Sequence, residues 1–227
     1  TRSVEPPNFS SLSPTAAGFT PLEPQAAWTA EVGARGRRGD FVWDIALYRA
    51  ELDKELLNYS VDANHPASTF NAEDTIHQGL EAAVDWRLAA RWRLRQTYSW
   101  SDFRFDGDAQ YGDNRLPIVP EHYYRAALEY RSKAGWFVAP TVEWAISDAF
   151  VDYANTLKAP SYAVASLNTG WRFENGVSLF VDVRNLFDKR YVSNVNAITD
   201  ARLPAVSKLV AFPGEGRAAF AGLRVSF

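Results

Sequence analysis

Residues 181–194 read VDVRNLFDKRYVSN, and the first four positions show how most of the chain is built. Val181 and Val183 fall on one face of an extended strand, whereas Asp182 and Arg184 fall on the other, because successive side chains of a strand point to opposite faces. The same alternation recurs along most of the sequence, and helical periodicity is hard to find. The sequence therefore predicts an all-β protein made of amphipathic strands.

The composition excludes several classes of protein. The 227 residues carry a formal net charge of −3, which is too balanced to indicate a nucleic-acid partner. The chain has no cysteine, so disulfides, zinc thiolate sites and thiol catalysis are excluded. Its three histidines lie apart and form no metal-binding motif. We therefore predict no catalytic site, no metal site and no enzyme activity.

The connections between the predicted strands alternate between short turns and long loops. About nine strands, each roughly ten residues long, begin near Trp28, Phe41, Ile76, Trp92, Tyr124, Trp136, Ala163, Val177 and Ala219, a length that suits a tilted strand crossing a bilayer. Short turns lie at 37–40, 89–90, 132–135 and 174–176, and long loops at about 62–74, 104–121, 149–160 and 186–216. This alternation is typical of an antiparallel transmembrane β-barrel of the bacterial outer membrane.

The tryptophans support the membrane interpretation. All eight fall on apolar strand faces, at Trp28, Trp43, Trp86, Trp92, Trp100, Trp136, Trp144 and Trp171. We interpret them as aromatic girdles in contact with outer-membrane lipid, where the indole ring lies in lipid and its N–H reaches water. The opposite face carries arginines and carboxylates that a dry core would not accommodate, so it is predicted to line the lumen. A soluble β-sandwich is the alternative, but it leaves the apolar rows unexplained.

An odd number of strands indicates a partial barrel, because bacterial single-chain barrels have an even number. We expect residues 1–25 to form an extracellular loop and residues 26–227 to form the strands of the C-terminal part of a larger barrel. The alternative is a small complete barrel of about ten strands. It would need a strand within residues 1–12, where proline and serine argue against one.

Several motifs resemble those of TonB-dependent outer-membrane receptors. The most specific is VRNLFDKRY, which is similar to a signature of the form V-x-N-L-F-D-x-x-Y. The segments that carry the resemblance are 1–7, 22–25, 30–36, 77–81, 116–122, 183–191 and 213–217. The terminal Phe227 resembles the C-terminal aromatic residue that serves this family as a barrel-assembly signal.

The resemblance implies a 22-stranded barrel with a plugged lumen, of which this chain would supply the last strands. It also implies an N-terminal plug domain, which is absent from this chain, and energy coupling to TonB through that missing part. The implied function is active uptake of a ferric siderophore, which is cargo rather than a cofactor. Uptake of cobalamin, haem or carbohydrate stays open, whereas copper uptake is disfavoured because cysteine, methionine and paired histidines are absent.

Candidate ligand contacts are aromatic, basic and histidine residues near the long loops. Aromatic rings stack on the chromophores of siderophores, and arginine pairs with their acidic groups. The candidates are Tyr111, Arg115, His122, Tyr123, Tyr153, Tyr162 and Arg190. Two other functions stay open: a passive pore or small structural barrel without TonB coupling, and a surface adhesin that binds a partner through residues 186–216.

Other conspicuous residues are interpreted as structural. Asn185, Phe187 and Asp188 are expected to shape the exit from a strand. Pro140 lacks the N–H that a strand ladder uses, so it predicts a bulge or a local break. Three arginines near a short turn are expected to face the plug or to pair with Glu81 and Asp85; they are Arg91, Arg93 and Arg95.

Overall fold

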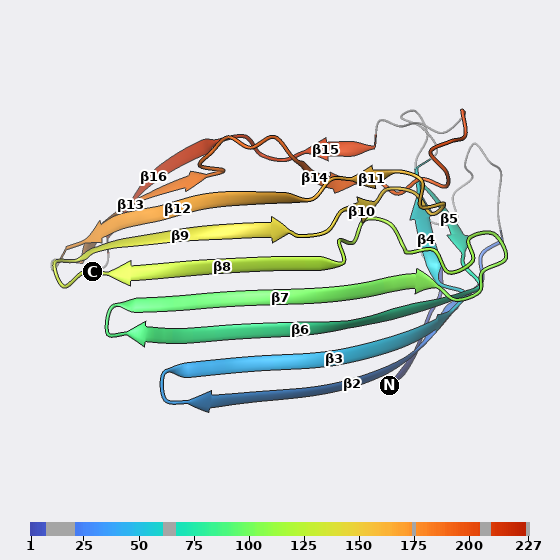
Figure 1. Cartoon of the computed structure of the whole chain (residues 1–227), viewed down its shortest axis with the longest axis horizontal. Helices are drawn as coiled ribbons and strands as arrows, with labels where there is room; N and C mark the ends of the chain where they lie inside the picture. Colours follow the sequence, from blue (N-terminus) through green and yellow to red (C-terminus); the bar gives the residue numbers. More distant parts are fainter. Residues whose placement is uncertain (8–20, 61–66, 174–175, 205–209, 226–227) are drawn as a thin grey trace.

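The computed structural model describes residues 1–7, 21–60, 67–173, 176–204 and 210–225, and the statements below concern these residues. Ten strands form one antiparallel sheet (Figure 1). In spatial order they are β1 (Arg2–Glu5), β2 (Gln25–Arg38), β3 (Phe41–Asp53), β6 (Asp74–Ala89), β7 (Trp92–Phe105), β8 (His122–Arg131), β9 (Trp136–Ala145), β12 (Tyr162–Arg172), β13 (Val177–Arg184) and β16 (Ala218–Val225). No described segment forms a helix long and apolar enough to cross a membrane.

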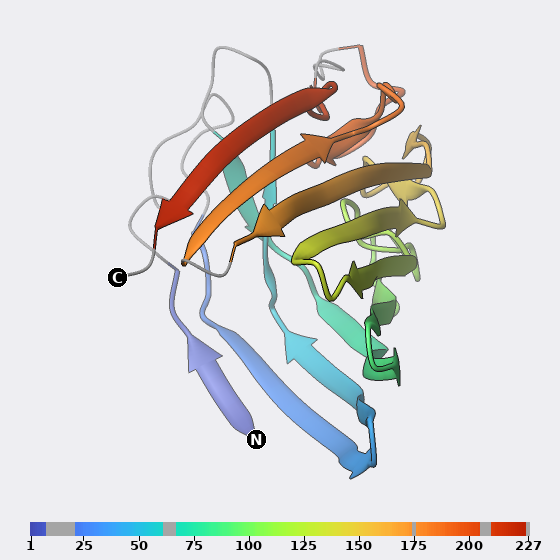
Figure 2. The ribbon, with the colours of Figure 1, turned by 90° about the vertical axis from the view of Figure 1, so that its left-hand side faces the viewer.

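The short turns all lie at one end of the sheet and the long connections at the other (Figure 1). Figure 2, which looks from the short-turn end, shows that the sheet curves into an open arc. The long connections contain three two-stranded ribbons, which are β4 (Leu56–Tyr59) with β5 (Ser68–Asn71), β10 (Ala149–Phe150) with β11 (Lys158–Ala159), and β14 (Val192–Val195) with β15 (Ala211–Pro213). This is the arrangement of turns and loops that the sequence predicts.

The register of the strands confirms the predicted division into an apolar and a polar face. Trp86 lies opposite Leu94 on one face of the β6–β7 pair, and Trp136 lies opposite Trp171 on the same face of the β9–β12 pair. We call the other face the inner face. It carries the polar rows, such as Asp85 opposite Arg95 and Arg125 opposite Glu143.

The buried apolar side chains lie mainly in the long connections. One cluster gathers around Phe105, with Ala72, Tyr111, Leu116, Tyr153 and Ala197. A second cluster consists of Val151, Val195, Ile198, Ala201 and Val210. We call the connections that form these clusters, residues 54–60, 67–73, 105–121, 146–161, 192–204 and 210–213, the loop cap. The sheet therefore has a packed cap at its long-loop end.

The expectation of a loop over residues 1–25 is wrong at its start. All nine predicted strands are present, and β1 adds a tenth by pairing with β2 from Arg2 opposite Trp28 to Glu5 opposite Gln25. Proline was the reason to expect no strand here. It does not prevent this one, because β1 is a short edge strand that ends before Pro6 and Pro7. Phe227, the predicted assembly signal, lies outside the described residues.

The local break predicted at Pro140 is confirmed. Pairing between β8 and β9 runs through Ala127 opposite Thr141 and resumes at Tyr130 opposite Val138, without a change of register. On its other side Pro140 remains opposite Leu167 in the continuous β9–β12 ladder. The missing N–H therefore interrupts one ladder without forming a bulge.

Candidate functional site

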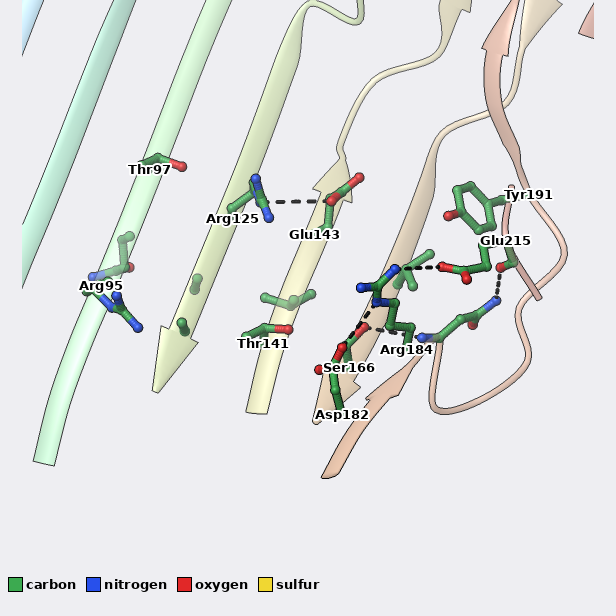
Figure 3. Close-up of a pocket in the computed structure, with 16 residues that line it drawn as sticks. Arg95, Thr97, Arg125, Thr141, Glu143, Ser166, Asp182, Arg184, Tyr191 and Glu215 are labelled. Atoms are coloured by element: carbon green, nitrogen blue, oxygen red, sulfur yellow. Dashed lines mark hydrogen bonds and ion pairs between the residues drawn. The ribbon is translucent and has the colours of Figure 1, made fainter. Parts of the chain in front are cut away.

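A hollow of about 500 Å³ lies on the inner face, across β7, β8, β9, β12 and β13 (Figure 3). Its volume is in the range of about 300–1,000 Å³ that small-molecule sites occupy. Alternation along each strand brings its lining together, because every second side chain points to this face. Segment 185–191 and Glu215 close the hollow on the β13 side.

Charged side chains of both signs line this hollow. Arg125 lies directly opposite Glu143 on the neighbouring strand, with Arg125 Nε 3.8 Å from Glu143 Oε2. Arg184 lies between Asp182, at 3.1 Å from Nε to Oδ2, and Glu215, at 3.7 Å from Nη1 to Oε2. The Arg125 side chain is 65% exposed, so this ion pair is weak and its partners remain available to a ligand.

Tyrosines adjoin the charged groups. Tyr162 Oη donates a hydrogen bond of 3.4 Å to Glu143 Oε1, and its ring lies 4.5 Å from that of Tyr191. A second hollow of about 430 Å³, towards the loop cap, shares Glu143 with the first and is also lined by Tyr123 and Tyr162. Glu143 thus connects the two hollows into one recess with aromatic and charged walls.

Two of the predicted ligand residues, Tyr123 and Tyr162, line this recess, whereas Tyr111 and Tyr153 do not. Tyr111 and Tyr153 are buried in the loop cap, and Tyr153 Oη donates to the carbonyl of Asn58 at 2.8 Å. Burial raises the pKa of Tyr111 to about 12 and raises that of Tyr153 as well. The structure therefore places these two rings in the framework of the cap and away from the recess.

The other three predicted residues also lie away from the recess. Arg115 is held by Asp102, at 2.9 Å, and by Glu121. His122 Nδ1 lies 2.8 Å from the hydroxyl of Tyr98, on the face opposite the inner one. Arg190 is exposed, beyond the end of β13. Arg115 and Arg190 lie where their loops carry them, and His122 lies at a position of β8 whose side chain points to the outer face.

Residues 185–188, which we call the NLFD segment, carry three side chains that were interpreted as structural, and this interpretation is confirmed for two of them. Asn185 is 2% exposed, and its Nδ2 donates to the carbonyls of Lys189, at 2.8 Å, and Glu215, at 2.9 Å. Asp188 Oδ1 accepts a hydrogen bond of 2.9 Å from the backbone N–H of Arg217. Phe187 is 76% exposed, so its side chain does not shape the strand exit.

The residues around Arg125 were not singled out by the sequence, although a signal for some of them was present. Arg125, Glu143 and Asp182 belong to the predicted polar rows, and the register then fixes which of them are neighbours. Glu215 and Tyr191 had no such signal, because they reach the recess only through the folding of the last long connection. Residues 213–217 of that connection pack on residues 188–191: Arg217 N–H donates to Asp188, and a Cβ on Gly214 would lie 2.1 Å from the Tyr191 ring.

No group of three or more histidine or acidic side chains among the described residues is placed to hold a metal ion.

A family model described as "TonB dependent receptor-like, beta-barrel" matches residues 1–186. The chain belongs to this family. TonB-dependent receptors are transporters of the bacterial outer membrane rather than enzymes, so this TonB-dependent receptor barrel is an outer-membrane protein.

Named relatives of this TonB-dependent receptor barrel include two curated proteins. The pesticin receptor of Yersinia enterocolitica is 25% identical over 166 residues, which are 71% of this chain and 24% of that protein. The catecholate siderophore receptor Fiu of Escherichia coli (strain K12) is 25% identical over 209 residues, which are 86% of this chain and 27% of that protein. The chain therefore spans about a quarter of the length of these relatives.

The fold also matches solved receptors. The ferric yersiniabactin uptake receptor FyuA from Yersinia pestis superposes with a TM-score of 0.78 at 20% identity, over 100% of this chain and 34% of that one. The match covers β16 and the segment after residue 186, which the family model does not reach. The whole described sheet therefore has the fold of part of a TonB-dependent receptor barrel.

Proposed function

We propose that this chain is part of the barrel wall of an active importer whose cargo is a ferric siderophore. The observation that carries the proposal is the recess on the inner face, where Arg125, Tyr162 and Tyr191 surround Glu143. An anionic, partly aromatic iron chelate suits such a site, because guanidinium groups bind its acidic oxygens and tyrosine rings stack on its chromophore. The two curated relatives are named as receptors, one of them for catecholate siderophores.

The importer requires more of the barrel than this chain contains. The sheet has two edges in the described structure, and β1 covers only the start of β2, so the backbone groups of residues 30–38 face no strand on that side. Exposed edges of this kind are closed in a barrel. We expect further strands on both edges, a plug domain in the lumen, and TonB as the source of energy.

The outward rows are the surface that we propose meets lipid. Trp28, Trp86, Trp92, Trp136, Trp144 and Trp171 are each more than a third exposed. Trp92 and Trp136 lie next to short turns, and both pack on Tyr130. The centroid of the Tyr130 ring lies 4.7 Å from that of Trp92 and 5.0 Å from that of Trp136. Such a cluster suits the periplasmic boundary, and Trp28, Trp100 and Trp144 suit the opposite one.

In the proposed mechanism the cargo enters from the cap side and displaces wall contacts in the recess. Arg125 gives up its weak ion pair with Glu143, at 3.8 Å, and binds an acidic group of the cargo. Tyr162, released from Glu143, presents its ring. The step involves no covalent chemistry, and release towards the periplasm follows movement of the plug.

The test is uptake by the full-length receptor in cells that lack their own siderophore receptors. Radiolabelled ferric catecholate, hydroxamate and phenolate siderophores are offered with and without TonB, and haem and cobalamin serve as comparison cargoes. We expect TonB-dependent uptake of one siderophore class. Uptake of haem or cobalamin alone would replace the cargo, and equal passage of small solutes without TonB would favour the passive pore.

A further inference from the structure

The inner face carries its charges unequally along the strands. Within about five residues of a short turn, which is ~16 Å of strand, its arginines are Arg35, Arg37, Arg87, Arg93, Arg95, Arg131, Arg172 and Arg224. Among the described residues, its acidic members in the same zone are Asp44, Asp85 and Glu129, and Asp40 of the adjacent short turn lies 3.6 Å from Arg87. Further from the turns the balance reverses, because Glu31, Glu81, Glu143 and Asp182 accompany Arg125 and Arg184. We call the first zone the arginine zone.

Two of the acidic residues in the arginine zone are already paired within the wall. Asp85 accepts from Arg93 Nε at 2.7 Å. Glu129 is bound by Arg131 and lies 4.0 Å from Arg95. These contacts leave the zone with a surplus of positive charge.

Several arginines of the zone have no carboxylate within ion-pair distance in the described part of the chain. They are Arg35, Arg37, Arg172 and Arg224. Arg35 lies opposite Asp44 in the β2–β3 ladder without forming an ion pair, and Arg37 Nε donates only to the carbonyl of Gly39, at 3.1 Å. All four are exposed, so solvent satisfies them as long as the lumen is wet.

We propose that the arginine zone is the docking surface for an acidic face of the domain that fills the lumen. The inference rests on the proposed function, in which a plug occupies the barrel. Where a plug packs directly against this face it displaces water, and an arginine that loses its water without gaining a partner is strongly unfavourable. The domain must therefore bring carboxylates to the periplasmic half of this wall, whereas the extracellular half already supplies its own.

The test is ion conductance of the purified full-length receptor in planar bilayers with potassium chloride. The variant combines Arg35→Glu, Arg172→Glu and Arg224→Glu, and the control combines Arg38→Glu, Arg91→Glu and Lys133→Glu. The control makes the same change of charge in the short turns (Arg91 and Lys133) and at the strand end beside one of them (Arg38), away from the inner face. We expect the zone variant to open conducting channels at least about tenfold more often than wild type, since like charges now face each other, and the control to stay closed.

A glutamine series separates docking from misfolding. Arg35→Gln, Arg172→Gln and Arg224→Gln remove charge without repulsion, and the unheated gel mobility of each barrel reports that it is folded. We expect intermediate opening from this folded variant. Folded Glu and Gln variants that both stay as closed as wild type would overturn the inference while leaving siderophore uptake intact.

A wild-type receptor that conducts anions freely would give a different result. It would mean that the lumen is water-filled and that the arginine zone selects anions. That outcome would overturn both the inference and the proposed active import, whereas a closed, importing wild type with insensitive variants removes only the inference.

Discussion

In the sheet, Val32 and Leu223 are 69% and 63% exposed, whereas in the loop cap Phe105 and Ile198 are completely buried. The same kinds of apolar side chain therefore have opposite environments within one chain. The sheet is held by continuous antiparallel ladders, and its apolar rows meet whatever surrounds the barrel. The cap is held by an ordinary protein core. Truncation of a large apolar residue should therefore destabilise the cap and leave the sheet nearly unchanged.

The largest expected effect is that of Phe105→Ala. The ring stacks on Tyr111 at 5.0 Å and contacts Tyr153 edge-on, so its removal leaves a cavity in the cap and should cost about 3–5 kcal/mol of local stability. Hydrogen exchange of cap amides in the full-length receptor, in detergent micelles, measures this. The matched control, Leu223→Ala, should change neither cap nor sheet; equal loss from both variants would end the distinction between the two regions.

Asn185→Ala should have the next largest effect, because Asn185 holds together the backbone at the junction between the sheet and the last long connection. The substitution removes the two hydrogen bonds that Asn185 Nδ2 donates to backbone carbonyls and the Oδ1 acceptor for Lys189 N–H, and it places alanine at φ +46°. We expect a loss of about 3 kcal/mol, from unsatisfied buried groups and backbone strain. Thermal unfolding of the full-length receptor measures the loss. Phe187→Ala, two residues away and exposed, should leave the melting temperature unchanged.

High pH should loosen the cap before the sheet. The pKa of Tyr111 is raised to about 12 by burial, so the folded cap holds this proton more tightly than the unfolded chain, whose tyrosine pKa is about 10. Its contribution is complete below pH about 10 and is lost as pH rises through about 12, by up to about 3 kcal/mol. Protease susceptibility of the cap against pH reports this. Tyr111→Phe should shift the onset to higher pH, and an unshifted onset would exclude Tyr111 as the cause.

The smallest expected effect concerns binding. Arg125→Ala should weaken the affinity of the full-length receptor for its ferric siderophore about tenfold, or about 1.4 kcal/mol, because one exposed guanidinium is lost. Fluorescence quenching titration with the cargo identified by uptake measures the dissociation constant. Arg38→Ala, which removes the same charge at the end of β2 beside a short turn, is the control. Equal affinity of both variants would move the binding site away from this recess.

The strands and their faces could be predicted from the sequence because each rests on a local rule. Alternation places Arg125 and Glu143 on the inner face and Trp136 and Trp171 on the outer one, whatever the partner strands are. The role of Asn185 was also accessible, since asparagine tolerates the left-handed backbone at a strand exit. The edge strand β1 was missed because four residues next to two prolines carry little local signal.

The candidate site could be predicted only in part, because long-range packing decides it. Tyr111 and Tyr153 share the sequence features of the recess tyrosines, yet they are buried in the cap, where Tyr153 bonds to a residue 95 positions away. Whether these two tyrosines are buried depends on which of the long connections pack against each other. Tyr191, in contrast, reaches the recess because the last connection folds back onto the NLFD segment.

The class of the protein, the faces of its strands and the end at which the long loops lie could all be read from the amino-acid sequence. These follow from side-chain periodicity and turn length, which are properties of neighbouring residues. The pairs of charges on the inner face, the identity of the buried tyrosines and the position of the cap core became known only from the three-dimensional fold. Such outcomes depend on strand register and on contacts between distant segments, and a local pattern does not contain them.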